Sequence, residues 1–251
     1  MRSYAVKAAL LAAALIFAPA AAQAAEVTLL ISNALKTVME DIAPRFEQAA
    51  GHKLMITYGS TNPLKARIEK GEAFDLTILG DDAINDLVKQ GKLAAATRTV
   101  VARSGLGIAV RKGAPKPDIS TADAFKRTML DAKSVGYLDD GLTGTYLKVL
   151  FQRLGIADNV KAKHKSVRGG EAVAAGEVEL GVTQISEVLY QQGTELAGPL
   201  PPAIQHYTNF SSAVSAGAKQ PDAAKALLKY FLSPEAARVM KSIGLEPAGP
   251  N

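Results

Sequence analysis

The feature that most constrains the fold is an alternation of short apolar segments with segments of helical periodicity. In the first part of the chain, each segment rich in Val, Ile, Leu or Met is followed by one whose apolar residues recur every three or four positions. A glycine follows each helical segment, where helices commonly end. The predicted strands cover 26–31, 53–57 and 74–79, and the predicted helices cover 34–50, 65–70 and 83–90. This alternation favours an α/β protein, with a mostly parallel sheet flanked by helices.

A second series of the same kind follows after a change of pattern. Two apolar segments, 99–102 and 106–110, have no helix between them, and we predict two strands separated by a polar turn. Further strands are predicted at 134–138, 160–164 and 180–183, with helices at 121–132, 146–154, 167–175 and 186–191. A proline-rich connection (196–202) leads to an extended stretch (203–216), and helices are predicted at 222–232 and 234–243.

The two series predict a chain of two lobes. We assign residues 25–105 and 206–251 to lobe 1 and residues 106–205 to lobe 2, with 106–110 and 203–216 as the crossing segments. In open α/β sheets, ligands bind at the carboxyl ends of the strands. If these edges face each other, the polar turns of both lobes converge on one cleft.

The N-terminus has the pattern of an export signal. Arg2 and Lys7 give a basic start, residues 8–18 form an uninterrupted apolar run, and a small-x-small cleavage pattern ends at Ala24. We predict that residues 1–24 are removed and that the mature protein lies in the periplasm. An N-terminal membrane anchor is the alternative. The chain has no cysteine, which excludes a disulfide, a thiol nucleophile and a lipid-bearing Cys.

The charge of the chain is mildly basic. Taking Arg2 and Lys7 from the 29 basic residues leaves 27 against 24 acidic ones, a net charge of +3. The densest basic run, 161–165, is typical of a solvated strand edge. We therefore predict no nucleic-acid partner, and a small anionic ligand is compatible with this charge.

The turn after the second predicted strand combines hydroxyl and amide groups. Ser60, Thr61 and Asn62 stand between the strand and the next helix, and Pro63 follows them. Proline suits the first helical position, which would make Asn62 the N-cap. The free N–H groups and the dipole at such a helix start attract an anion. On this stretch alone, an ordinary capped helix start is the alternative.

Similar polar turns recur along the chain, and none contains a catalytic motif. The candidate binding residues from these turns are Ser32, Asn33, Ser60, Thr61, Asn62, Thr143, Gly144, Thr145, Arg168 and Gln184. Apart from Arg168 they are neutral hydrogen-bonding groups or glycine, a composition that binds a small anion without reacting with it. The histidines are predicted at the surface. We therefore predict a binding protein and not an enzyme, with no cofactor and no metal.

Two pairs of adjacent carboxylates leave other functions open. Asp81-Asp82 and Asp139-Asp140 follow predicted strands and could hold a hard cation, although helix capping or solvent exposure is favoured. A metal-dependent periplasmic hydrolase is the enzyme alternative. A ligand-sensing module of the same fold would differ in its partner and not in its site.

Four segments resemble the periplasmic solute-binding proteins of ABC importers, and most closely the molybdate-binding family. They are residues 30–36, 58–64, 71–79 and 176–182, and the third contains the Gly-Glu-x-x-Asp turn that is characteristic of the class. The resemblance covers essentially the whole mature chain. It implies the two-lobed type II periplasmic binding protein fold, closure of the lobes on a ligand, a monomer, and an ABC permease as partner.

The resemblance also implies site residues. A family serine falls on Ala34, a hydroxyl pair falls on Ser60 and Thr61, and a tyrosine falls on Gln184. Backbone contacts of the family fall on the turn at 143–145 and on Val167, next to Arg168. Because one serine and one tyrosine are replaced while amides and an arginine are present, we predict a small organic carboxylate as the ligand. Molybdate or tungstate is the alternative.

Overall fold

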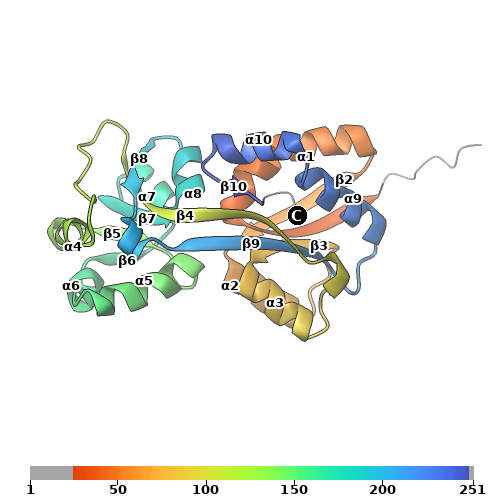
Figure 1. The fold of residues 1–251 in the computed structure, drawn as a ribbon, viewed down its shortest axis with the longest axis horizontal. Coiled ribbons are helices and arrows are strands. Elements are labelled where there is room, and N and C mark those ends of the chain that lie inside the picture. Colours follow the sequence, from red (N-terminus) through yellow and green to blue (C-terminus); the bar gives the residue numbers. More distant parts are fainter. Residues whose placement is uncertain (1–24, 249–251) are drawn as a thin grey trace, which may run out of the picture.

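Two antiparallel strands, β4 (Thr99–Arg111) and β9 (Tyr207–Val214), join the two halves of the molecule. The computed structural model describes residues 25–248, and in it these strands run side by side from one half to the other (Figure 1). The described strands form one mixed sheet of order β2-β1-β3-β9-β4-β7-β5-β6, and β8 and β10 also pair with β4. The α/β class is as predicted.

The first half is a sheet with helices on both faces. Its strands are β1 (Glu26–Ser32), β2 (Lys53–Gly59), β3 (Leu76–Gly80) and β10 (Glu246–Pro247). Its helices are η1 (Asn33–Leu35), α1 (Lys36–Ala50), α2 (Thr61–Glu69), α3 (Asp81–Lys89), η2 (Ala95–Thr97), α9 (Pro221–Phe231) and α10 (Pro234–Ser242). Strand β1 is parallel to β2 and β3, and β9 is antiparallel to β3. Neighbouring side chains of β1 enter different cores, since Leu29 and Ile31 pack with α1, α9 and α10 whereas Leu30 packs with α2 and α3.

The second half is built around the far end of β4. Its strands are β5 (Val135–Tyr137), β6 (His164–Ser166), β7 (Leu180–Gln184) and β8 (Thr194–Pro199). Its helices are α4 (Ala122–Asp131), α5 (Leu142–Arg153), α6 (Ala157–Lys161), α7 (Gly169–Ala175), α8 (Ile185–Tyr190) and η3 (Pro202–Ile204). Its main core is aromatic in part, with Phe151 stacked on Phe125 at a centroid distance of 6.5 Å. The lobe boundaries themselves stay a prediction.

Several predicted elements are corrected by the structure. Residues 99–102 and 106–110 belong to one continuous strand, β4, because the polar residues between them are also paired: Arg103 lies opposite Asn209 and Ser104 opposite Thr208. Of the predicted strand 160–164, residues 160–161 end helix α6, residues 162–163 form a turn and only His164 lies in a strand, β6. The first part of the predicted proline-rich connection belongs to β8. The turn predicted before the helix at 146 is the first turn of α5.

Helix α2 begins earlier than predicted. Its N-cap is Ser60, so Asn62 is the second helical residue and not the cap. Pro63 tolerates the third position because its missing N–H has no helical partner there. The predicted export signal, residues 1–24, lies outside the described residues. Within 25–248, no helix combines the length and the apolar character needed to cross a bilayer.

Candidate ligand-binding cleft

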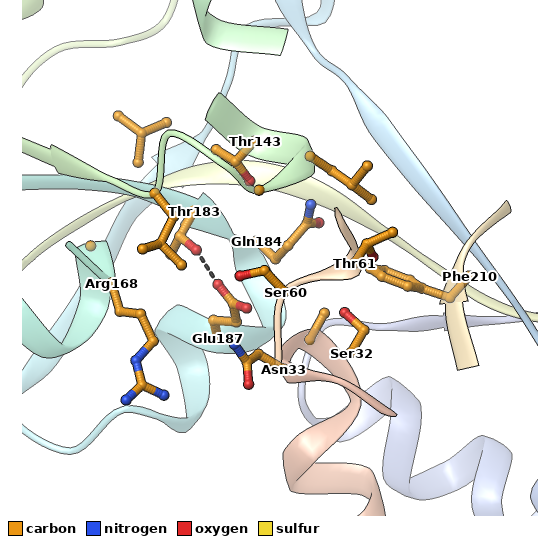
Figure 2. Close-up of a pocket in the computed structure, with 16 residues that line it drawn as sticks. Ser32, Asn33, Ser60, Thr61, Thr143, Arg168, Thr183, Gln184, Glu187 and Phe210 are labelled. Carbon is orange, nitrogen blue, oxygen red and sulfur yellow. Dashed lines mark hydrogen bonds between the residues drawn. The ribbon is translucent and has the colours of Figure 1, made fainter. Parts of the chain in front are cut away.

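A polar cavity lies where both halves present the ends of strands and the starts of helices. The residues that line it are Ser32, Asn33, Ala34, Ser60, Thr61, Leu138, Gly141, Leu142, Thr143, Arg168, Gly169, Val182, Thr183, Gln184, Glu187 and Phe210. Figure 2 shows Ser32, Ser60 and Thr61 of the first half facing Thr143 and Gln184 of the second. The cavity volume is ≈ 50 Å³, which holds about four water-sized groups.

The cavity brings together most of the residues predicted from the sequence. Those that line it are Ser32, Asn33, Ala34, Ser60, Thr61, Thr143, Arg168 and Gln184. They converge because β1 and β2 of the first half and β7 of the second half run in opposite directions, so that their carboxyl ends meet at the cleft, where each passes directly into a helix.

The other predicted residues lie behind the cavity wall. The Asn62 amide donates to the carbonyl of Asp140 at 2.8 Å, and the Thr145 hydroxyl donates to the Gly141 carbonyl at 3.0 Å. Gly144 packs so closely that an added Cβ would lie 2.1 Å from the Leu138 carbonyl oxygen. Val167 packs in a small apolar cluster with residues such as Val178. These residues shape and join the walls, and they do not line this cavity.

Hydroxyl groups of the first half remain available to a ligand. Ser60 and Ser32 hold N-cap positions, and neither side chain bonds to its own helix. Thr61 accepts a hydrogen bond from the Gly80 N–H at 3.1 Å, which leaves its own hydroxyl proton free to donate. The first-turn N–H groups of α2 have no partner within the helix. This wall therefore offers donors to an anion.

Gln184 carries an unsatisfied polar atom at the floor of the cavity. Its Nε2 donates to the Thr208 hydroxyl at 3.0 Å, whereas its Oε1 has no hydrogen-bond partner among the described residues. The side chain is 5 % exposed, and a buried polar atom without a partner costs roughly 1–3 kcal/mol. Rotating the side-chain amide by half a turn would exchange Oε1 and Nε2. Gln184 can therefore offer a ligand either an acceptor or a donor.

Glu187 is the functional candidate that the sequence prediction missed. Its carboxylate accepts a short hydrogen bond from the Thr183 hydroxyl, and Figure 2 shows it turned into the group of cavity side chains. Burial raises the pKa of this carboxyl, opposed by the Thr183 bond and by Arg168, while Glu171 adds to the increase. The sequence signal was its place in the first turn of the helix after β7, three residues beyond Gln184.

Arg168 lies at the edge of the cavity and not at its centre. Its Nε is 3.0 Å from a carboxylate oxygen of Glu171, and about half of its side chain is exposed. In Figure 2 its guanidinium points away from Thr143 and Gln184. The positive charge therefore stands beside the polar cavity.

A second cavity adjoins the first along this edge. The two share Asn33, Arg168, Gly169 and Glu187. The second has a volume of ≈ 80 Å³, and its further lining residues are Lys36, Thr37, Gly170, Glu171, Tyr190 and Gln191. Lys36 Nζ lies 3.6 Å from Glu40 and 5.9 Å from the ring centroid of Tyr190. We call the first the neutral chamber, because its lining is uncharged apart from the shared Arg168 and Glu187. We call the second the cationic chamber, because Lys36 and Arg168 line it, beside Glu171 and Glu187.

One member of each predicted carboxylate pair contacts other side chains. Asp81 accepts from Arg98 and from the Ser211 hydroxyl, both at 2.5 Å. Asp139 lies 3.9 Å from a ring nitrogen of His164. Among residues 25–248, no group of three or more His, Cys, Asp or Glu side chains could hold a metal ion.

The three histidines, which were predicted at the surface, are each partly buried and partly exposed. His164 stacks on Tyr137 at 3.8 Å and His206 stacks on Tyr146 at 4.5 Å, while His52 accepts a hydrogen bond from the Ala25 N–H. None of them lines either cavity of the cleft.

Comparison with known proteins identifies the class. The family of bacterial extracellular solute-binding proteins matches residues 27–246, so the chain belongs to this family. The periplasmic molybdate-binding protein of Azotobacter vinelandii superimposes with a TM-score of 0.71 at 16% identity, covering 90% of this chain and 100% of that one. The sulfate-binding protein SubI of Mycobacterium tuberculosis gives 0.73 at 17% identity, with 90% and 88% covered. The fold is that of the type II periplasmic binding proteins, as predicted.

Two relatives are similar in sequence over most of their length. An aconitate isomerase of a Pseudomonas species is 36% identical, covering 88% of this chain and 87% of the relative. The molybdate-binding protein ModA of A. vinelandii is 28% identical, with 89% and 91% covered.

Proposed function

We propose that the chain is the exported binding protein of an ABC importer, and that its cleft takes a small organic polycarboxylate. The observation that carries the proposal is the pair of adjoining cavities that share Asn33, Arg168 and Glu187. A ligand with two or more carboxylates would place one in the neutral chamber and another in the chamber with Lys36 and Arg168. Family membership supports the receptor role, and an inner-membrane permease is the proposed partner.

The neutral chamber suits one carboxylate. Its volume of ≈ 50 Å³ holds a group of that size, and hydroxyls, amides and helix-start N–H groups satisfy the carboxylate's acceptors. The cationic chamber gives the second carboxylate a charged partner, since Arg168 offers a planar fork of N–H donors and Lys36 a compact positive charge.

A metal oxyanion is the alternative ligand, favoured by the relatives and structures named for molybdate. The family serine and tyrosine are here Ala34 and Gln184, which weakens the oxyanion assignment.

Isomerisation of an unsaturated carboxylic acid is a second candidate function. The Pseudomonas relative is named as an aconitate isomerase, and aconitate is an unsaturated tricarboxylate. The name of this relative supports a polycarboxylate as the ligand of this chain.

A thermal-shift panel tests the proposed ligand class. The protein from residue 25 onward is heated with acetate, succinate, citrate, cis- and trans-aconitate, sulfate, molybdate and tungstate. A ligand at 100 times its Kd stabilises the folded state by about 2.7 kcal/mol. We expect stabilisation by a di- or tricarboxylate, and stabilisation by molybdate but by no organic acid would overturn the proposal.

A further inference from the structure

The carboxyl group of Glu187 stands at the junction of the two cavities of the cleft. It lines both of them, and its side-chain partner among the described residues is the hydroxyl of Thr183. The nearest guanidinium, that of Arg168, makes its ion pair with Glu171 instead. Glu187 is therefore an acid that faces the ligand space and is not neutralised by a salt bridge within the described chain.

Glu187 is not explained by anion binding alone. Its carboxylate does not attract the carboxylates of a ligand, and its bond to Thr183 joins the end of β7 to the first turn of α8. Burial raises the pKa of this carboxyl, which makes its carboxylate a stronger base than that of an exposed glutamate. The charged or titratable groups around it are Arg168, Glu171, Lys36 and Tyr190. This environment is typical of a carboxyl that transfers protons.

We infer that Glu187 is a catalytic base that moves a proton between two carbons of a bound unsaturated polycarboxylate, so that the cleft isomerises the ligand's double bond. The inference rests on the proposed function, because the ligand must be a polycarboxylate that spans both chambers. In that pose the carbons between two carboxylates lie beside Glu187.

The reaction balances without a co-reactant. The Glu187 carboxylate takes a proton from the CH₂ group next to one carboxylate, and that C–H bond breaks. The electron pair shifts the C=C bond by one position, and the proton held by Glu187 is returned to the far carbon, where a new C–H bond forms. The charge that develops on the ligand is stabilised by Lys36, Arg168 and the chamber hydroxyls.

Proton exchange measured by NMR tests the inference. The protein from residue 25 onward is incubated with cis-aconitate, and separately with trans-aconitate, in D₂O. We expect the other isomer to appear faster than in buffer alone. Carbon-bound proton signals are lost to the extent that the proton on Glu187 exchanges with D₂O before it is returned. Glu187→Gln keeps the shape of the side chain and should still bind aconitate in the thermal-shift assay, with exchange slowed at least ~100-fold.

Two further variants make the result decisive. Glu177→Gln removes an exposed carboxylate of the α7–β7 turn, outside both cavities, and should exchange at the wild-type rate. Glu187→Asp keeps a carboxylate but shortens the side chain by one methylene, so we expect slowed but measurable exchange. If Glu187→Gln does not fold, Glu187→Asp takes its place in the test.

The outcomes separate the two proposals. If the wild type binds aconitate without forming the other isomer, or if Glu187→Gln forms it at the wild-type rate, the catalytic role is overturned and the receptor function stands. If no polycarboxylate binds, the proposed function fails and the catalytic role with it.

Discussion

At the residue scale, Lys36 decides whether the cleft distinguishes a polycarboxylate from a simple anion. It stands one helical turn beyond Asn33, which lines both chambers, so its charge reaches the second chamber and not the first. The side chain is about two-fifths exposed and its pairing with Glu40 is long, at 3.6 Å. Such a pair holds the lysine weakly, and its ammonium is available to a ligand.

Substitution of this lysine has a ligand-dependent effect. We expect Lys36→Gln to weaken binding of a tricarboxylate about tenfold, because a hydrogen bond to a charged group is worth roughly 1.5–3 kcal/mol. Binding of a monocarboxylate should change less than twofold. Titration calorimetry measures both, with Lys70→Gln as a control that removes an exposed positive charge outside both chambers. Equal losses for both ligands would place Lys36 outside the contact.

His206 makes stability depend on pH. Burial lowers the pKa of this histidine, with Asp82 opposing the change. The unfolded chain therefore takes up a proton near the ordinary value of about 6.5, whereas the folded chain resists it. Stability should fall as the pH drops below about 6.5, and His206→Gln should flatten that part of the curve. Urea unfolding between pH 5 and 8 checks this, and an unchanged slope in the variant would contradict it.

At the element scale, Asp75 ties three segments together before β3. The side chain is 3 % exposed. One carboxylate oxygen accepts from the Thr28 N–H at 2.8 Å, and the other from the N–H groups of Lys219 and Gln220 at 2.7 and 2.8 Å. The aspartate of the Gly-Glu-x-x-Asp turn therefore anchors β1 and the start of α9, and it does not contact the cleft.

Replacement of this aspartate should be costly for stability. We expect Asp75→Asn to lower the free energy of unfolding by about 2–4 kcal/mol, because the amide nitrogen cannot accept the bonds that one oxygen accepts. Ligand affinity, extrapolated to the fully folded protein, should be unchanged. Chemical denaturation tests this against Asp131→Asn, an exposed position at the end of α4. A loss below 1 kcal/mol would show that water replaces these bonds.

The elements that local periodicity describes were predictable from the sequence, and those set by distant contacts were not. The strand-and-helix alternation of β1 to α3 has its signal within each segment. The prediction split strand β4 into two strands because the sequence Arg103-Ser104-Gly105 resembles a turn. In the structure, pairing with β9, which is distant in sequence, keeps these residues extended. The cleft residues at strand ends were predictable because their signal also lies within the local sequence. Glu187 was missed because its exposure to the cleft depends on how α8 packs against η1, far away in sequence.

At the scale of the whole molecule, contacts across the cleft hold the two halves together. Asn62 donates to the Asp140 carbonyl, Ser186 donates to the Ala34 carbonyl at 3.2 Å, and the Tyr190 hydroxyl donates to Glu40. Each joins a segment of the first half to one of the second. Interactions that stabilise the closed arrangement of the two halves therefore increase the affinity for a ligand bound between them.

Removing one of these contacts should weaken binding without touching the neutral chamber. We expect Tyr190→Phe to lower ligand affinity about threefold to tenfold, because one hydrogen bond to a charged group is lost from the closed arrangement. Tyr230→Phe is the matched control, since that hydroxyl bonds Glu235 at 3.1 Å within one half. Calorimetry measures the affinities, and equal effects of the two substitutions would argue against a role in closure.

The most direct test of the central claim is a calorimetric titration of the wild-type protein with trans-aconitate and with molybdate. The two-chamber cleft predicts that the tricarboxylate binds with a 1:1 stoichiometry and at least about 100-fold more tightly than molybdate, a difference of about 2.7 kcal/mol. Tight binding of molybdate with no heat from aconitate would contradict the account.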